Sequence, residues 1–152
     1  MPIGLCLHLI NEVKKTDGFI YMDYASPSTQ YAFDVNKSPL FRKGSKNYIN
    51  VLGIKQLNTL ENVSLLDIFL STHNVVEPHY HQNAAELVYC ISGVATVSML
   101  NPFIKQILNF PITPGQAANV PQGWWHYEMA TVDDLRPHTR DFSHELGRFF
   151  CL

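Results

Sequence analysis

The chain has 152 residues, enough for one domain with a substantial hydrophobic core. The 11 lysines and arginines and the 13 aspartates and glutamates give a formal net charge of −2. The only basic cluster is the short stretch 41–46, so the charge pattern does not predict a nucleic-acid partner. Nine prolines and an aromatic share of 12% favour a β-rich domain with many turns over a helical bundle.

The apolar start of the chain, Met1–Ile10, has no basic lead-in and contains a histidine, so it does not have the pattern of a signal peptide. No stretch approaches the roughly 20 apolar residues of a membrane-spanning helix. Cys6, Cys90 and Cys151 are few, odd in number and widely spaced, which favours a reducing compartment over a disulfide framework. We therefore expect a cytoplasmic protein with no membrane partner.

Residues 1–48 are predicted to form an N-terminal extension that packs on the main domain. Apolar residues at the odd positions of 3–9 predict a short strand, and residues 19–22 predict another. Residues 24–48 are rich in Ser, Pro, Asn, Lys and Gly with little periodicity, which indicates an irregular covering arm.

Residues 49–131 are predicted to form the main β domain. Short runs of β-branched, aliphatic and aromatic residues recur about every ten residues and are separated by Gly, Pro and Asn, a pattern typical of a sandwich or a closed barrel. The predicted strands cover 48–54, 63–70, 86–91, 94–100, 103–110 and 124–131.

Residues 132–152 form a tail of different character. Residues 133–141 are polar and carry a proline, and only Phe149–Leu152 is apolar. This tail predicts no closing strand, so we expect a barrel that is incomplete, altered at its C-terminal end or closed by a partner chain. An unclosed sheet edge also favours self-association into a homodimer or a larger homo-oligomer.

Four residues have the spacing of a metal site. Residues i and i+2 of a strand point to one face about 6.6 Å apart, so His79 and His81 can aim at one point. Glu86 begins the next apolar strand, and His126 follows from a later one. Neutral imidazoles with a carboxylate suit Mn, Fe, Ni, Cu or Zn. Because one carboxylate leaves a divalent ion with a net charge near +1, the site would attract a small carboxylate. A His-x-His pair alone is commonly an exposed pair without a metal.

The same residues resemble the first motif of the cupin family, a glycine-led His-x-His followed by Glu and Gly. The matching positions are His79, His81, Glu86 and Gly93. The leading glycine is absent, and Asn74 stands five residues before His79 as a substitute suited to a turn.

A second stretch resembles the second cupin motif, Gly-x5-Pro-x-Gly-x2-His-x3-Asn. Gly115, Pro121, Gly123 and His126 match it, and Ala130 replaces the final Asn. The residues around both motifs, 84–89 and 120–126, look most like the germin and oxalate-decarboxylase branch of the family.

The resemblance implies an all-β fold, the cupin double-stranded β-helix (jelly-roll) barrel, here with an N-terminal extension. It also implies a divalent transition metal, typically Mn²⁺, with Fe, Zn or Ni as alternatives, held by His79, His81, Glu86 and His126. Enzymes of this branch act on oxalate: germins oxidise it with one cupin domain, and oxalate decarboxylases use two. Other cupins bind small molecules or isomerise sugars.

Chemistry on a metal-bound carboxylate needs a proton carrier within hydrogen-bond reach. Glu128 lies two residues beyond His126 and shares its face by strand parity, which makes it the candidate catalytic residue. Alternatively, Glu128 lies beyond the barrel rim, solvated or paired with a Lys or Arg. Alternation also places one of Trp124 and Trp125 inside and the other outside, and predicts that Cys90 is a buried core residue.

Three functions compete at this stage. The first is a metal-dependent enzyme that acts on a small carboxylate, of the oxalate decarboxylase or oxidase type. The second is a cupin that binds a small ligand without turnover, and the third is a structural or storage protein in which the metal stabilises the fold.

Overall fold

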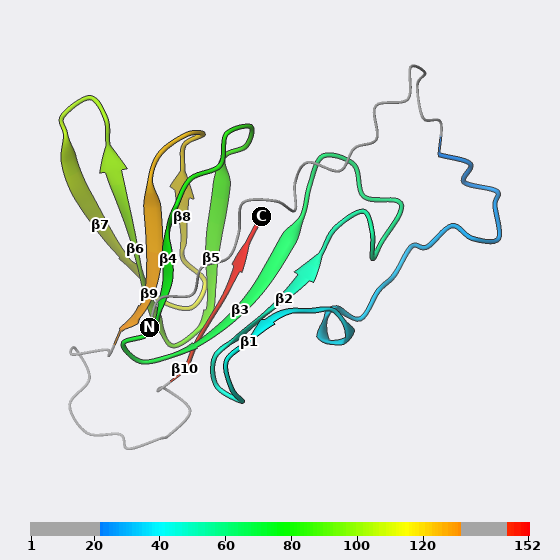
Figure 1. Cartoon of the computed structure of the whole chain (residues 1–152), viewed down its shortest axis with the longest axis horizontal. Helices are drawn as coiled ribbons and strands as arrows, with labels where there is room; N and C mark the ends of the chain where they lie inside the picture. Colours follow the sequence, from blue (N-terminus) through cyan, green and yellow to red (C-terminus); the bar gives the residue numbers. More distant parts are fainter. Residues whose placement is uncertain (1–21, 132–145) are drawn as a thin grey trace.

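The structure is a computed structural model that describes residues 22–131 and 146–152. Two antiparallel sheets face each other across a hydrophobic core (Figure 1), and no α-helix occurs in the described residues. The predicted all-β jelly-roll barrel is confirmed. The strands predicted at 3–9 and 19–22 lie outside the described residues, apart from Met22.

The larger sheet has six strands, preceded by a single 3₁₀ turn, η1 (Val35–Lys37). In spatial order it contains β1 (Pro39–Arg42), β2 (Tyr48–Leu52), β3 (Leu65–Ser71), β10 (Leu146–Cys151), β5 (Glu86–Ser92) and β8 (Ala117–Val120). The smaller sheet has the order β4 (Val75–His79), β9 (His126–Thr131), β6 (Val94–Asn101) and β7 (Gln106–Ile112).

Strand alternation fills the core from both sheets. In β5 the buried positions Glu86, Val88 and Cys90 alternate with exposed Leu87 and Tyr89. On the opposite sheet, alternate residues of β9 are buried in the same way, and in β6 Ser98 is buried as well as Ala95, Val97 and Met99. Cys90 is therefore a core residue, as predicted. The same alternation turns the first residues of β5 and β9, a glutamate and a histidine, toward the inside of the barrel.

The expectation that the tail supplies no strand is wrong. Strand β10 lies in the middle of the large sheet, where it pairs antiparallel with β3 on one side and β5 on the other. Gly147 and Arg148 break the apolar alternation that would have indicated a strand. Both residues are compatible with this position: a Cβ on Gly147 would come within 3.2 Å of the Ala130 Cβ, and the Arg148 guanidinium is paired with buried Asp67.

Strands β1, β4 and β8 were not among the strand ranges predicted from the sequence, although His79, the last residue of β4, was expected on a strand. Residues 39–42, inside the stretch expected to be irregular, form β1 at the edge of the large sheet. The short strands β4 and β8 have only five and four residues and lie beside turns. The strand predicted from residue 103 begins only at Gln106, because residues 102–105 make the hairpin turn with Lys105 at a φ of 55°.

No helix in the described part of the chain is long and apolar enough to cross a membrane. The cytoplasmic location stays a prediction.

Candidate metal centre

The two sheets bring the four predicted ligands together at one end of the barrel. His79 is the last residue of β4 and pairs with His126, the first residue of β9, so neighbouring strands supply both imidazoles. Glu86 is the first residue of β5 in the opposite sheet. His81 lies two residues beyond the end of β4, in a loop, and not on the same strand as His79 as the sequence suggested.

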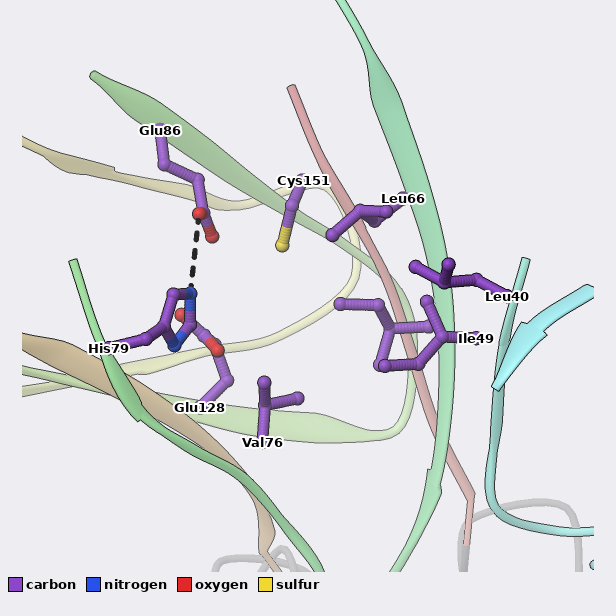
Figure 2. A pocket seen from close by; sticks show the side chains of 9 residues that line it. Leu40, Ile49, Leu66, Val76, His79, Glu86, Glu128 and Cys151 are labelled. Atoms are coloured by element: carbon purple, nitrogen blue, oxygen red, sulfur yellow. Dashed lines mark ion pairs between the residues drawn. The ribbon is translucent and has the colours of Figure 1, made fainter. Parts of the chain in front are cut away.

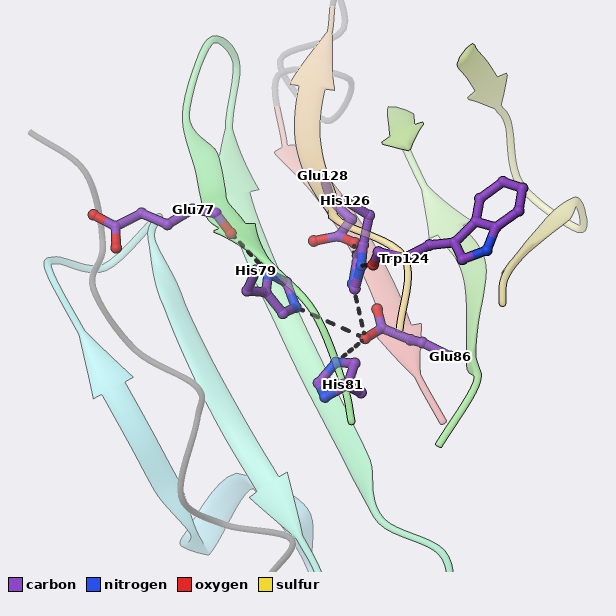
Figure 3. Close-up of polar contacts among 7 residues, drawn as sticks. All are labelled: Glu77, His79, His81, Glu86, Trp124, His126 and Glu128. Atoms are coloured by element: carbon purple, nitrogen blue, oxygen red, sulfur yellow. Dashed lines mark hydrogen bonds and ion pairs between the residues drawn. The ribbon is translucent and has the colours of Figure 1, made fainter. Parts of the chain in front are cut away.

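The side chains converge on one carboxylate oxygen (Figure 3). Glu86 Oε2 lies 2.6 Å from His81 Nε2, 3.3 Å from His126 Nε2 and 3.9 Å from His79 Nε2. One ligand atom from each of the four residues lies within 4.8 Å of all the others. His79, Glu86 and His126 are buried and His81 is half-buried, so the cluster is shielded from bulk water on most sides.

Backbone carbonyls fix the orientation of two imidazoles. The Nδ1 atom of His79 lies 2.7 Å from the carbonyl oxygen of Glu77, and the Nδ1 atom of His126 lies 2.9 Å from that of Trp124 (Figure 3). A carbonyl oxygen only accepts, so Nδ1 of each ring carries the hydrogen and donates it. In the neutral ring Nε2 then presents its lone pair to the cluster, the tautomer required of a metal ligand.

The loop that carries His81 is tied to the turn before β9. The Gly123 amide donates to the His81 carbonyl oxygen at 2.9 Å, and the Gln122 side-chain amide donates to the Gln82 carbonyl oxygen at 2.7 Å. Gly123 has a φ of +80°, which a residue with a side chain rarely adopts. The Pro-x-Gly part of the second motif therefore positions a ligand from the first motif as well as introducing His126.

The charges of the cluster depend on one another. Burial alone would raise the pKa of Glu86, but the imidazoles of His126, His79 and His81 hold it well below its usual value. Burial would lower the pKa of His79, but the neighbouring Glu86 and Glu128 carboxylates raise it to about 8. Without a metal, a proton on the His79 imidazole therefore balances the charge of the ionised Glu86.

Glu128 lies inside the barrel, next to the cluster. Its side chain is fully buried, and Oε1 lies 3.7 Å from His126 Nε2. Strand parity predicted this shared face, and the alternative of a solvated residue beyond the rim is wrong. Neither carboxylate oxygen has a hydrogen-bond partner, and Oε1 of Glu86 is also unpartnered. Burial and the nearby Glu86 charge raise the pKa of Glu128 to about 8.

A small cavity of about 10 Å³ separates the cluster from the apolar core (Figure 2). This volume is about the size needed for one water molecule. Polar atoms reach it from His79, Glu86 and Glu128, and the remaining wall is apolar apart from the Cys151 sulfur. Cys151 and Leu40 of β1 could not be predicted to line the cavity, because both come from segments that were not predicted to be strands.

These residues fit a transition-metal ion. Nitrogen and carboxylate ligands bind such ions at about 2.0–2.2 Å, so ligands on opposite sides lie about 4.2 Å apart. The observed limit of 4.8 Å requires the side chains to close by a few tenths of an ångström. A cation would also compensate the buried Glu86 carboxylate and its unpartnered Oε1. The cluster of three histidines and one glutamate can therefore hold a metal ion.

The tryptophans beside His126 face opposite ways, as alternation predicted. Trp124 packs against the core, while Trp125 is exposed and its ring lies 4.9 Å from that of Tyr80. The backbone carbonyls of Glu77 and Trp124, which orient the ligand rings, could not be found from the sequence, because any residue type supplies a carbonyl oxygen.

The sequence model described as Cupin matches residues 34–135, more than half of the chain. The chain therefore belongs to the cupin family. A comparison with curated proteins finds no match.

Solved structures of one bacterial enzyme share the fold. Oxalate decarboxylase from Bacillus subtilis at pH 4.6 aligns with a TM-score of 0.63 and 20% sequence identity, over 82% of this chain and 30% of that chain. A tryptophan-to-tyrosine variant of that enzyme aligns with a TM-score of 0.63 and 21% identity, over 82% of this chain and 31% of that chain. A structure from work on the Mn(II) centres of the same enzyme aligns with a TM-score of 0.61 and 20% identity, also over 82% of this chain and 31% of that chain. The chain thus spans about a third of the length of these proteins, and the likeness shows the fold.

Proposed function

We propose that this cupin binds one Mn²⁺ ion through His79, His81, Glu86 and His126 and acts on a small carboxylate such as oxalate. The observation that carries the proposal is the convergence of three imidazole Nε2 atoms on one buried carboxylate oxygen. The Mn(II) centres named for the structurally similar decarboxylase support manganese. Fe, Zn and Ni suit the same donor set.

The charge of the loaded site favours an anionic substrate. A bound divalent cation would withdraw electron density from a carboxylate placed beside it. With Glu86 ionised and three neutral imidazoles, the cluster itself contributes one negative charge, so the loaded site would carry a net charge near +1. The cavity behind the ligands has room for about one water molecule, so a carboxylate would approach the ion from another side.

Glu128 is the proposed proton carrier. It is the only carboxylate besides Glu86 among the described residues that line the cavity, and both its oxygens are free of hydrogen bonds. Its position, 3.7 Å from His126 Nε2, lets it reach a group bound next to that ring. A buried carboxyl group of this kind can hold or give up a proton without competition from bulk water.

One observation favours a second candidate, a cupin that binds a small carboxylate without turnover. The described residues that line the cavity include no Lys or Arg that could hold the second carboxylate group of a dicarboxylate. Such a protein would bind the metal and the ligand but release the ligand unchanged.

A turnover assay on the Mn-loaded chain separates these candidates. Oxalate and other small carboxylates are supplied with dioxygen, and substrate loss and product formation are measured for wild type, His81→Ala and Glu128→Gln. If the chain is an enzyme, we expect turnover by the wild type and none by H81A. In E128Q turnover should fall by about 10²–10⁴-fold while the metal content is retained. Saturable carboxylate binding without turnover in the Mn-loaded wild type would instead establish the binding protein.

A further inference from the structure

A groove of about 520 Å³ lies between β7 and β8, which are edge strands of the two different sheets. It is lined by residues 110–112 of β7, by residues 116–119 in and just before β8, and by Met99 of β6. Ligand-binding sites typically enclose roughly 300–1,000 Å³ and are mostly apolar. The groove therefore has the size and character of a binding site, and the described residues that line it include none of the metal ligands.

The walls of this groove are strand edges. Neighbouring residues of a strand point their side chains to opposite faces, so a groove lined by three consecutive residues of one strand lies along the edge of that strand. Residues 110–112 and 117–119 both meet this condition. In the described part of the chain, β7 pairs only with β6 and β8 only with β5, so both edges are open.

The open edge of β8 presents backbone hydrogen-bonding groups. The Gln116 carbonyl oxygen accepts from the Cys90 amide of β5 at 3.0 Å. In an antiparallel pair, residues that bond to the partner strand alternate with residues that point away from it, so the even-numbered residues of β8 bond to β5. Ala117 and Asn119 therefore direct their amide and carbonyl groups toward the open edge.

The edge of β7 is less suited to an added strand. The Leu100 amide of β6 donates to the carbonyl oxygen of Trp125, the residue before β9, at 2.8 Å. The even-numbered residues of β6 therefore bond to β9 and the odd-numbered ones to β7. Pro111 pairs with the even-numbered Thr96 and so faces the open edge, where it has no amide hydrogen to donate. Strand addition in this groove is therefore favoured at β8.

The side chains of the groove select an uncharged, apolar segment. No Asp, Glu, Lys, Arg or His occurs between residues 106 and 125. An ionised side chain placed against Met99 and Phe110 would lose its hydration without meeting an opposite charge. At one end of the groove, Gln116 Oε1 accepts from the Thr113 amide and hydroxyl, at 2.9 and 3.0 Å. This contact orients the side chain and leaves its Nε2 hydrogens to donate to a peptide carbonyl.

A single extended strand fits the groove better than a second copy of the chain does. Neighbouring strands lie about 4.8 Å apart, so one added strand occupies the space beside β8. The β8 edge of a second copy is flanked by that copy's own β7, which forms the other wall of the same groove. The two β7 strands would therefore obstruct direct pairing of two β8 edges.

We propose that the groove between β7 and β8 binds an extended, uncharged peptide segment of another protein. The segment adds a strand to the open edge of β8 and turns alternate apolar side chains toward Met99 and Phe110. The proposal does not depend on the proposed function, because the groove shares no lining residue with the cavity beside the metal centre.

The test is a titration of the full chain with a short synthetic peptide in which threonine and valine alternate and both ends are blocked. Wild type is expected to bind it saturably, with new protection of the Ala117 and Asn119 amides from hydrogen exchange. Ala117→Pro removes an edge amide hydrogen but no bond to β5. It should weaken binding by about tenfold or more, because main-chain hydrogen bonds supply the affinity in strand addition. The matched control is Ile107→Pro, at the open edge of β7 but outside the groove, which should bind as wild type does.

Two altered peptides separate strand addition from simple apolar contact. A peptide methylated at its backbone nitrogens should not bind, and one with lysine in place of valine should bind about tenfold more weakly or worse. Thermal melting checks that both protein variants are folded.

Equal binding by A117P and I107P, or binding of the methylated peptide, would overturn the proposal. So would a wild-type chain without saturable binding at roughly 1 mM peptide, the weak end of specific affinities. Wild-type dimers that A117P converts to monomers would also contradict it and assign the β8 edge to a second copy.

Discussion

Two of the carboxylates buried in the barrel, Asp67 and Glu128, differ in how they are compensated. Asp67, on β3, is fully buried and receives two hydrogen bonds from the Arg148 guanidinium, at 3.0 and 3.1 Å. Glu128, on β9, is equally buried, but neither of its oxygens has a hydrogen-bond partner. The charge of Asp67 is compensated by the Arg148 guanidinium, whereas Glu128 lies beside a group of potential metal ligands.

This difference separates a structural role from a functional one. A buried ion pair with good geometry holds two strands in register, and here Arg148 joins the C-terminal strand to the centre of the large sheet. A buried carboxyl group without a partner costs free energy of folding, and such groups persist where they contribute to a site. Asp67 thus helps to hold the C-terminal strand in the large sheet, whereas Glu128 stays inside the barrel without a hydrogen bond.

Breaking the Asp67 pair should have the largest effect on stability. Arg148→Ala leaves a fully buried carboxylate without its partner. Breaking a fully buried ion pair lowers the free energy of unfolding by about 3–5 kcal/mol. We expect a loss of about 2–3 kcal/mol here, because the Arg148 side chain is 34% exposed. Chemical unfolding of R148A measures this loss, and Arg148→Lys should recover part of it. A loss below about 0.5 kcal/mol would mean that the pair does not hold β10 in the sheet.

Replacing the titratable carboxyl group of Glu128 should change how stability depends on pH. Folded Glu128 has a pKa of about 8 against an ordinary value of 4.5, so the folded state keeps a proton that the unfolded chain releases. The free energy of unfolding of the metal-free protein should therefore fall as pH rises from about 4.5 to 8. His79 contributes a loss in the same direction, but only above its ordinary value of 6.5.

Between pH 5 and 6.5 the fall in the free energy of unfolding is due to Glu128 and not to His79. Glu128→Gln should reduce the fall over this range by about 1–2 kcal/mol. The measurement is chemical unfolding in the presence of chelator at several pH values. Glu77→Gln, which changes the other acidic residue of the same sheet, is the control and should keep the wild-type slope. An unchanged slope in E128Q would mean that Glu128 is not neutral inside the barrel.

The loop carrying His81 should show the smallest effect. Gln122→Ala removes the hydrogen bond to the Gln82 carbonyl, which is exposed to solvent, so we expect a stability loss of about 0.5 kcal/mol and a few-fold weaker metal binding. Metal titration of the chelator-treated variant measures this. Loss of metal binding altogether would show that the loop is held far more by this side chain than by the neighbouring Gly123 amide.

The spacing of His79, Glu86 and His126 predicted the site because strand alternation and motif offsets are local properties of the sequence. Parity likewise placed Glu128 on the inner face. The sequence could not reveal that Glu128 lacks hydrogen-bond partners, because that depends on which side chains from the opposite sheet reach it. It also placed His81 on a strand, whereas hydrogen bonds from a turn 40 residues away hold it in a loop.

The fold class was predictable from the recurring short strands, but the closing strand was not. Residues 146–151 carry a glycine and an arginine where an isolated strand would carry apolar side chains. Gly147 is favoured by the close approach of Ala130, and Arg148 by the buried Asp67, which is 81 residues earlier in the chain. Both reasons are tertiary contacts, so no local pattern could have shown them.

The most direct test of the account is the metal content of the chain, purified without chelator or nickel affinity, in wild type and His81→Ala. We predict about one Mn or Fe ion per wild-type chain and its loss in H81A, because the variant lacks one of the four protein ligands that hold the ion. A wild-type chain that contains no metal and takes up none after reloading with Mn²⁺ would contradict the account, since the four converging side chains would then form only a hydrogen-bonded cluster.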